Sequence, residues 1–180
     1  MPPGALILTM LGTVSGRKRQ NWGMHALRHL HDRGIQAVLL IVGTSFIKPT
    51  FNLKQTQFVE EIKTGYDNPF VRFIPTTLCS KEVLLLSDLH LSSSVSEAFP
   101  LNVIEAMQLG IPVIATDVGG TGEQFTKKET SWMLVKDKHN MIAFVEAVYF
   151  AATLRPEHRQ YLGRVNINTA DSVHEDFSRV

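Results

Sequence analysis

Short apolar runs alternate with helical segments along this chain, and this alternation constrains its fold more than any other feature. Each run has the length of one strand, and the predicted strands are Ala5–Leu11, Gln36–Val42, Val71–Ile74, Leu89–Ser92, Pro112–Thr116 and Trp132–Val135. Helices are predicted between and after these strands. The first is capped by Asn21 and runs to about Arg33, and the others are a helix ended by Gly65, a short one from Ser80, Leu101–Leu109, Met141–Ala152 and a last one from Arg155. Strands alternating with helices are typical of a parallel sheet covered on both faces. The sequence therefore predicts an α/β fold: a single doubly wound, Rossmann-like domain with a mainly parallel sheet of about six strands and helices on both faces.

The composition of the chain limits the kinds of molecule that it can bind and the compartments that it fits. The 180 residues fit one domain, and a net charge of +1 gives no global field for binding DNA or an anionic membrane. We therefore expect no nucleic-acid partner, and membrane contact is not indicated. A single cysteine, Cys79, excludes a disulfide framework and fits a reducing compartment. Residues 1–4 lack the basic region of a signal peptide, so we expect a cytoplasmic protein.

A basic cluster follows the first predicted strand. Arg17, Lys18 and Arg19 lie in the loop after Gly12. Ligands bind at the carboxyl ends of the strands in doubly wound sheets, and cations there can hold a phosphate through charge-assisted hydrogen bonds. A solvated basic turn is the simpler interpretation of this run alone. The glycine spacing fits neither a Walker P-loop nor a dinucleotide fingerprint, so a nicotinamide cofactor is not expected.

A second segment, residues 96–107 (SEAFPLNVIEAM), runs from the end of a predicted strand into the start of a helix. Backbone N–H groups at a helix N-terminus suit an anion, and Pro100 fits the first helical turn. Glu97 would lie at the mouth of such a site, whereas Glu105 would share the polar stripe of the helix with Asn102. A carboxylate can accept hydrogen bonds from two adjacent hydroxyls, so these groups suit a nucleotide sugar. The alternative is that Glu105 belongs to a solvated helix face.

Two further features have simpler interpretations. Glycines in residues 116–123 (TDVGGTGE) permit close approach of backbone to ligand, but an ordinary strand-to-helix turn has the same composition. His25 and His29 are four apart on a predicted helix, and we interpret them as part of a solvated helix face because no third ligand is evident. No metal site is predicted.

The stretch from Leu91 to Glu123 resembles the signature of the group 1 glycosyltransferases, the large retaining family 4. Two glutamates separated by seven residues are the hallmark, and Glu97 and Glu105 match them. The loop 12–20 (GTVSGRKRQ) is similar to the family's phosphate loop, and the resemblance runs in the same order from Leu6 to about Phe177.

The family has the GT-B architecture of two facing Rossmann-like domains, and its C-terminal domain binds the nucleotide-sugar donor. The resemblance therefore implies that residues 1–180 are the donor-binding, C-terminal half of a GT-B glycosyltransferase. It implies retaining, hexosyltransferase-type transfer from a nucleotide-diphosphate sugar to an acceptor hydroxyl in carbohydrate biosynthesis, with no cofactor and no metal.

The resemblance also implies a role for each matching residue. Glu97 matches the glutamate that contacts the donor sugar near the reaction centre, and it is the expected catalytic residue. Glu105 matches the glutamate that binds the ribose hydroxyls, and Lys18 matches the lysine on the diphosphate. The segment whose backbone amides approach the sugar and the diphosphate is matched by Phe99, Leu101 and Asn102.

The chain departs from the family pattern at three positions. Members often have an arginine directly after the first loop glycine, where this chain has Thr13, so we expect Arg17 to supply the missing phosphate contact. Ala98 and Pro100 stand where glycine is common. The family's base-binding loop falls at Ile74, Pro75 and Thr76.

GT-B catalysis takes place between two domains, yet only residues 1–4 precede the first predicted strand. We therefore expect the N-terminal acceptor domain to be absent from the chain and supplied in cis or by a partner chain, and the isolated chain to be inactive. Two alternatives stay open. One is a non-catalytic nucleotide-sugar-binding module that serves a partner chain, and the other is a nucleotide-sugar epimerase of the same architecture.

Overall fold

The computed structural model describes residues 4–43, 53–75 and 79–165, and it has a six-stranded sheet at its centre. The strands are β1 (Leu6–Leu11), β2 (Ala37–Val42), β3 (Val71–Ile74), β4 (Leu89–Ser92), β5 (Val113–Thr116) and β6 (Leu134–Val135). They lie in the order β3-β2-β1-β4-β5-β6, and every pairing between neighbours is parallel. The predicted α/β fold is confirmed, and its sheet is parallel throughout.

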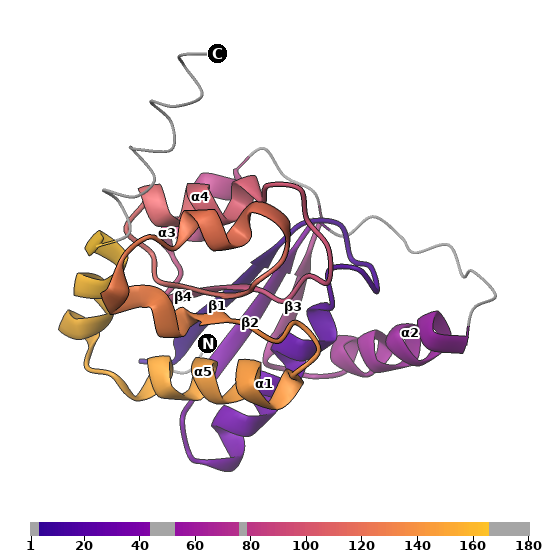
Figure 1. Ribbon diagram of the computed structural model, residues 1–180. Coiled ribbons are helices and arrows are strands. Elements are labelled where there is room, and N and C mark those ends of the chain that lie inside the picture. The colour runs from indigo at the N-terminus through magenta and orange to yellow at the C-terminus, as the bar shows by residue number, and fades with distance from the viewer. Residues whose placement is uncertain (1–3, 44–52, 76–78, 166–180) are drawn as a thin grey trace.

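Helices cover both faces of the sheet. They are α1 (Gln20–Asp32), α2 (Leu53–Tyr66), α3 (Ser80–Leu85), α4 (Leu101–Gln108) and α5 (Met141–Thr153), with a further helical stretch at 156–165. In Figure 1, α1 and α5 lie on one side of the sheet, whereas α3 and α4 lie on the other. Two 3-10 helices, η1 (Gly119–Gln124) and η2 (Lys128–Met133), connect β5 to β6.

The sequence of β2 (AVLLIV) explains why both faces are covered. All six of its residues are buried, as expected of a central strand in a parallel sheet. Leu39 and Ile41 join the main core, which also contains Leu27 of α1. Alternate residues of the strand, Val38, Leu40 and Val42, face the other layer and form a second apolar cluster with Val83 of α3.

The order of the strands reverses between β1 and β4. The chain moves from β1 to β2 and β3 on one side of this point, and from β4 to β5 and β6 on the other. Ligands of open α/β sheets bind outside the carboxyl ends of the strands at such a switch point. The loops that leave β1 and β4 are therefore the first place to look for a site.

Glycines let the backbone at the ends of β1 and β2 pack closely together. Gly12 has φ 123° and Gly43 has φ 105°, a region that favours glycine. A Cβ on Gly43 would lie 2.9 Å from the carbonyl carbon of Gly12. The Gly12 N–H donates to the carbonyl of Val42 at 2.9 Å, which ties the start of the β1 loop to β2.

One local prediction is wrong, and another gives a strand that is too long. Asn21 does not cap α1: the N-cap is Arg19, in a left-handed conformation with φ 51°, and the Asn21 side chain donates to Glu61 instead. The predicted strand Trp132–Val135 has only Leu134 and Val135 in the sheet, because Trp132 belongs to η2, where its ring packs edge-on against Phe150. Among the described residues, no helix is both long and apolar enough to cross a membrane.

Candidate functional site

The loops that leave β1 and β4 are joined to each other at the carboxyl edge of the sheet. The Val95 N–H donates to the carbonyl of Arg17 at 2.9 Å. The Ser93 hydroxyl lies 3.0 Å from the carbonyl oxygen of Lys18 and 2.8 Å from that of Arg19. These contacts hold the basic loop against the end of β4, so that its cations meet the segment that carries Glu97.

Lys18 and Glu97 form an ion pair at this junction. Lys18 Nζ lies 2.7 Å from Glu97 Oε1, and the two side chains are only 16% and 11% exposed. Arg17 Nη1 lies 3.1 Å from the same oxygen and donates to the carbonyl of Ser96 at 2.8 Å, but the Arg17 side chain is 53% exposed. The structure therefore places a sheltered lysine–glutamate pair at the centre and an arginine at the rim.

The environment of Glu97 keeps it ionised. Burial by itself would raise the pKa of this carboxyl, but the hydrogen bond from Lys18 and the positive charges of Lys18 and Arg17 oppose it. The net result is a pKa of Glu97 below its ordinary value. A sheltered carboxylate that stays charged beside cations is typical of functional sites.

Hydrogen bonds within the basic loop hold its backbone in place. The Lys18 N–H donates to the carbonyl of Ser15 at 3.0 Å. The buried Gln20 side chain accepts from the Ser15 N–H at 3.2 Å and donates to the carbonyl of Thr13 at 3.1 Å. A Cβ on Gly12 would lie 3.3 Å from Lys18 Cε, so the lysine side chain crosses the glycine closely. The loop thus holds the backbone of Lys18 in place and leads its side chain over Gly12.

The glycine turn after β5 supports the Glu97 segment from the other side. The Gly120 N–H donates to the carbonyl of Ala98 at 2.8 Å. A Cβ on Gly119, whose φ is 51°, would lie 1.7 Å from the carbonyl oxygen of Glu97, and one on Gly120 would lie 2.5 Å from the Phe99 ring. The turn is therefore more than a connection, because its glycines let the backbone pack directly against residues 97–99.

Helix α4 starts next to this segment. Its N-cap, Pro100, makes no side-chain capping bond, and the first-turn amides of Leu101 and Asn102 have no acceptor within the helix. Glu105 is exposed and, four residues after Leu101, lies on the same face of α4. The sequence-predicted residues Arg17, Lys18 and Glu97 thus meet directly, whereas Leu101, Asn102 and Glu105 line up along the neighbouring helix.

Two predicted elements lie apart from this arrangement. Arg19 does not join the ion pair: its guanidinium lies 4.6 Å from the centre of the Trp22 ring and donates to the carbonyl of Lys138 at 2.6 Å. Of the residues expected to bind the base, Ile74 is the last residue of β3, Pro75 follows it, and Thr76 lies outside the described residues.

Sequence reasoning missed His90. This residue of β4 is fully buried, with its Nδ1 3.2 Å from Thr9 Oγ1 and its Nε2 3.0 Å from Asn102 Nδ2. Burial, reinforced by the positive charge of Lys18, lowers the pKa of His90 to about 3, so the ring is neutral at physiological pH. A histidine in an apolar strand gives no periodic signal, and only the fold shows that it lies under α4.

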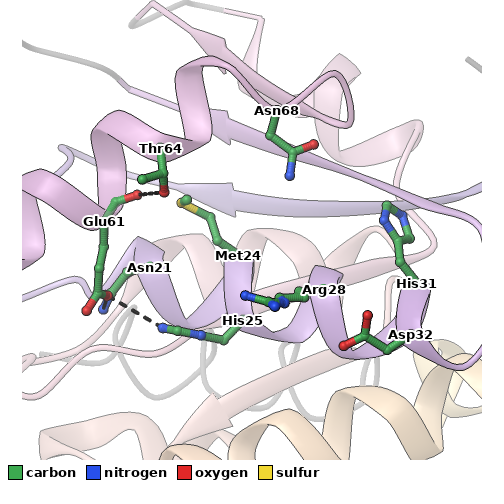
Figure 2. A pocket seen from close by; sticks show the side chains of 9 residues that line it. All are labelled: Asn21, Met24, His25, Arg28, His31, Asp32, Glu61, Thr64 and Asn68. Carbon is green, nitrogen blue, oxygen red and sulfur yellow. Dashed lines mark hydrogen bonds and ion pairs between the residues drawn. The ribbon is translucent and has the colours of Figure 1, made fainter.

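A second polar hollow lies between α1 and α2. Figure 2 shows this groove, of about 450 Å³, with side chains from both helices around it. Asn21 Nδ2 donates to Glu61 Oε2 at 2.5 Å, and His25 Nε2 lies 3.5 Å from the same oxygen. The second histidine of the pair, His29, lies 3.1 Å from Glu146 Oε1, so the two predicted solvent-facing histidines each have a glutamate partner.

Comparisons with known proteins agree on one family. The family model described as glycosyl transferases group 1 matches residues 2–168. TuaC of Bacillus subtilis, named for a glycosyltransferase of teichuronic acid biosynthesis, is 41% identical over 80 residues, which are 44% of this chain and 18% of TuaC. A D-inositol 3-phosphate glycosyltransferase of Rhodococcus erythropolis is 29% identical over 142 residues, which are 74% of this chain and 31% of that protein.

Solved structures show the same fold. Sucrose-phosphate synthase from Thermosynechococcus elongatus superposes with a TM-score of 0.77 at 23% identity, over 96% of this chain and 42% of the synthase. HepE of Anabaena, in complex with UDP and glucose, superposes with a TM-score of 0.73 at 16% identity, over 98% of this chain and 49% of HepE. The chain thus spans less than half the length of each of these four proteins.

Proposed function

Because the chain belongs to the group 1 glycosyltransferases, we propose that it forms the donor-binding domain of such an enzyme and holds a nucleotide-diphosphate sugar at the carboxyl edge of its sheet. The Lys18–Glu97 ion pair, 2.7 Å long and close to the first turn of α4, is the observation that carries this proposal. It combines a cation for a diphosphate, a carboxylate for sugar hydroxyls and helix amides for an anion. The presence of UDP in the related HepE structure supports the same ligand class.

We propose that the leaving diphosphate is stabilised by the protein's own cations and amides. Cleavage of the sugar–phosphate bond builds negative charge on the diphosphate. Lys18, Arg17 and the first-turn amides of α4 would face that charge, and fixed donors of this kind stabilise a transition state without reorganising. These groups supply the charge stabilisation that a metal ion would otherwise provide, so the proposal includes no metal.

Glu97 is the proposed catalytic residue. As the diphosphate binds, it would draw Lys18 and Arg17 away from the carboxylate, which then becomes available to the sugar hydroxyls. The anomeric carbon becomes oxocarbenium-like as the bond breaks, and a nearby carboxylate favours that positive charge. We propose that the acceptor attacks from the face that the diphosphate leaves, so that the anomeric configuration is retained.

The nucleoside is proposed to lie along α4. Glu105 is exposed on the face that also presents Leu101, and its two oxygens suit two adjacent ribose hydroxyls. The acceptor would bind outside this chain, because the chain spans less than half the length of its relatives. We propose that the acceptor-binding half is supplied in cis or by a partner chain.

The direct test is a titration of the 180-residue chain with UDP, GDP and ADP, followed by the NMR shifts of its backbone amides. At least one diphosphate should shift the amides of Lys18 and of residues 97–102, and the matching nucleoside without phosphate should shift Lys18 less. No shift with any of the three, or shifts confined to the α1–α2 groove, would overturn the proposal. Retention is tested on the two-domain enzyme by assigning the anomer of the first product by NMR.

A further inference from the structure

We propose that His90 is a positioning residue, which fixes the first turn of α4 against the switch point of the sheet so that the α4 amides and Lys18 receive a diphosphate together. This role rests on the proposed donor site. Its basis is the hydrogen bond of 3.0 Å between Asn102 Nδ2 and His90 Nε2, which joins α4 to the buried strand β4.

The hydrogen bonds define one arrangement of the ring. A side-chain amide nitrogen only donates, so Nε2 of His90 is the bare nitrogen and Nδ1 carries the proton. That proton faces Thr9 Oγ1 at 3.2 Å, and the Thr9 hydroxyl in turn lies 3.5 Å from the carbonyl oxygen of Leu89. Thr9 and His90 are register partners across β1 and β4. A line of polar contacts therefore runs from the two strands of the switch point into the first turn of α4.

The neutral state of the ring is what the site requires. Burial and the nearby Lys18 hold the pKa of His90 at about 3, so the ring adds no second positive charge beside the lysine. A protonated ring would repel Lys18 and would lose the bare nitrogen that accepts from Asn102. An apolar residue would fill the same space in β4 but would leave the Asn102 amide without this acceptor.

The same polar line explains why α4 can begin without a conventional cap. Pro100 gives no side-chain capping bond, so the first turn is not tied down from its own N-terminus. Asn102 ties it down from inside, through a bond to a side chain that is 0% exposed. The backbone amides of that turn then remain available to a ligand while their position is fixed.

The test compares His90→Phe, His90→Gln and Asn102→Ala with the wild-type chain, using whichever of UDP, GDP and ADP binds it most tightly. His31→Phe is the matched control, because His31 is also hydrogen-bonded, through Nε2 to the carbonyl of Ala37 at 2.9 Å, but lies on α1 next to the amino end of β2. His90→Phe and Asn102→Ala should each weaken the diphosphate roughly tenfold, the scale of one lost hydrogen bond. His90→Gln, which keeps an acceptor, should retain most of the affinity, and His31→Phe should retain all of it.

Two readouts separate positioning from a general loss of stability. In the ligand-free chain, the amide shifts of Leu101 and Asn102 should move in His90→Phe and not in His31→Phe, and ¹⁵N shifts should show the His90 proton on Nδ1. The double variant His90→Phe/Asn102→Ala should bind no more weakly than either single variant. If His90→Phe does not fold, Asn102→Ala and the ¹⁵N shifts still decide the matter.

The outcomes keep the two proposals apart. If the wild-type chain binds a diphosphate and both His90→Phe and Asn102→Ala bind it equally well, the positioning role is overturned and the donor site stands. Additive losses in the double variant would also overturn the role. If none of the three diphosphates binds the wild-type chain, the donor site fails and the positioning role fails with it.

Discussion

Polar side chains surround a glutamate both at the carboxyl edge of the sheet and in the α1–α2 groove, but the two glutamates differ in their exposure to solvent. At the carboxyl edge, Glu97 is 11% exposed and its nearest cation, Lys18, is 16% exposed. In the groove, Glu61 is 29% exposed and its partner His25 is 43% exposed. Loops from two strands and a glycine turn hold the first glutamate, whereas the second lies between two helix surfaces.

This difference in exposure shows that a hollow by itself does not define a binding site. The groove is lined by polar groups that water can solvate, and exposed ion pairs contribute little to stability. Sheltered charges are costly to desolvate, so an ion pair at a switch point of the sheet points to a ligand site rather than to a gain in stability. Variants at the carboxyl edge, compared with matched variants elsewhere, can therefore separate the two regions.

The largest effect is expected at the glycine turn. Gly119→Ala would place a Cβ 1.7 Å from the carbonyl oxygen of Glu97, at a position whose φ is 51°. We expect the free energy of unfolding to fall by about 3 kcal/mol, as for other substitutions that combine overpacking with backbone strain. Denaturant unfolding measures this change.

Gly34→Ala is the control for backbone strain alone. Gly34 has φ 75°, but a Cβ there would meet nothing within 4 Å. We expect a loss of about 1 kcal/mol, the cost of the left-handed conformation. Equal losses at the two glycines would show that the Gly119 backbone does not press against the Glu97 segment.

The next effect concerns ligand affinity. Lys18→Ala removes the sheltered cation, and we expect it to weaken UDP, or whichever diphosphate binds, by about 2 kcal/mol, the scale of a charged hydrogen bond. Arg28→Ala removes a cation that lines the α1–α2 groove and should leave the affinity unchanged. Isothermal titration calorimetry on both variants decides between the two regions, and a larger loss in Arg28→Ala would favour the groove.

The fold was predictable because its signal is local and repeated. Apolar runs such as AVLLIV report burial on both faces, and the alternation with helices then leaves few topologies. The rule that ligands bind at the carboxyl ends of parallel strands pointed to the loops that carry Arg17, Lys18 and Glu97, and the family resemblance supplied their expected roles.

The remaining features depend on contacts between distant residues. In the sequence, His90 is a polar residue in a short apolar strand with no evident role. Only the structure shows its contacts with Thr9 and Asn102. Residues 119 and 120 look like turn glycines until the backbone of residues 97–99 is seen against them. The start of α1 was mistaken for the same reason, because Asn21 bonds to Glu61 on another helix rather than to its own first turn.

A third prediction uses the buried histidine as a probe of pH. The pKa of His90 lies at about 3 in the folded chain and near 6.5 in an unfolded one, so between these values the unfolded chain binds a proton that the folded chain does not. Stability should therefore fall as pH falls from about 6.5, by at most about 1.4 kcal/mol per pH unit from this group.

The measurement is denaturant unfolding between pH 6.5 and pH 5, where the depressed pKa of Glu97 keeps its carboxylate ionised in the folded chain. Stability from Glu97 is present above its unfolded pKa and is lost only as pH falls through its lower folded pKa, so it does not mask the histidine in this window. His90→Phe should flatten the slope. Parallel slopes for wild type and His90→Phe would show that His90 is not held neutral by burial.

The smallest effect should come from the groove. His25→Gln removes a histidine whose Nε2 lies 3.5 Å from Glu61 Oε2, between side chains that are 43% and 29% exposed. Exposed pairs contribute between about 0 and 1 kcal/mol, and we expect a change of stability below about 0.5 kcal/mol with no change in diphosphate affinity. Thermal unfolding and calorimetry on the same sample measure both. A substantial loss of affinity in His25→Gln would mean that the α1–α2 groove takes part in binding along with the sheltered ion pair. Exposure to solvent would then not distinguish a binding region from a region that does not bind.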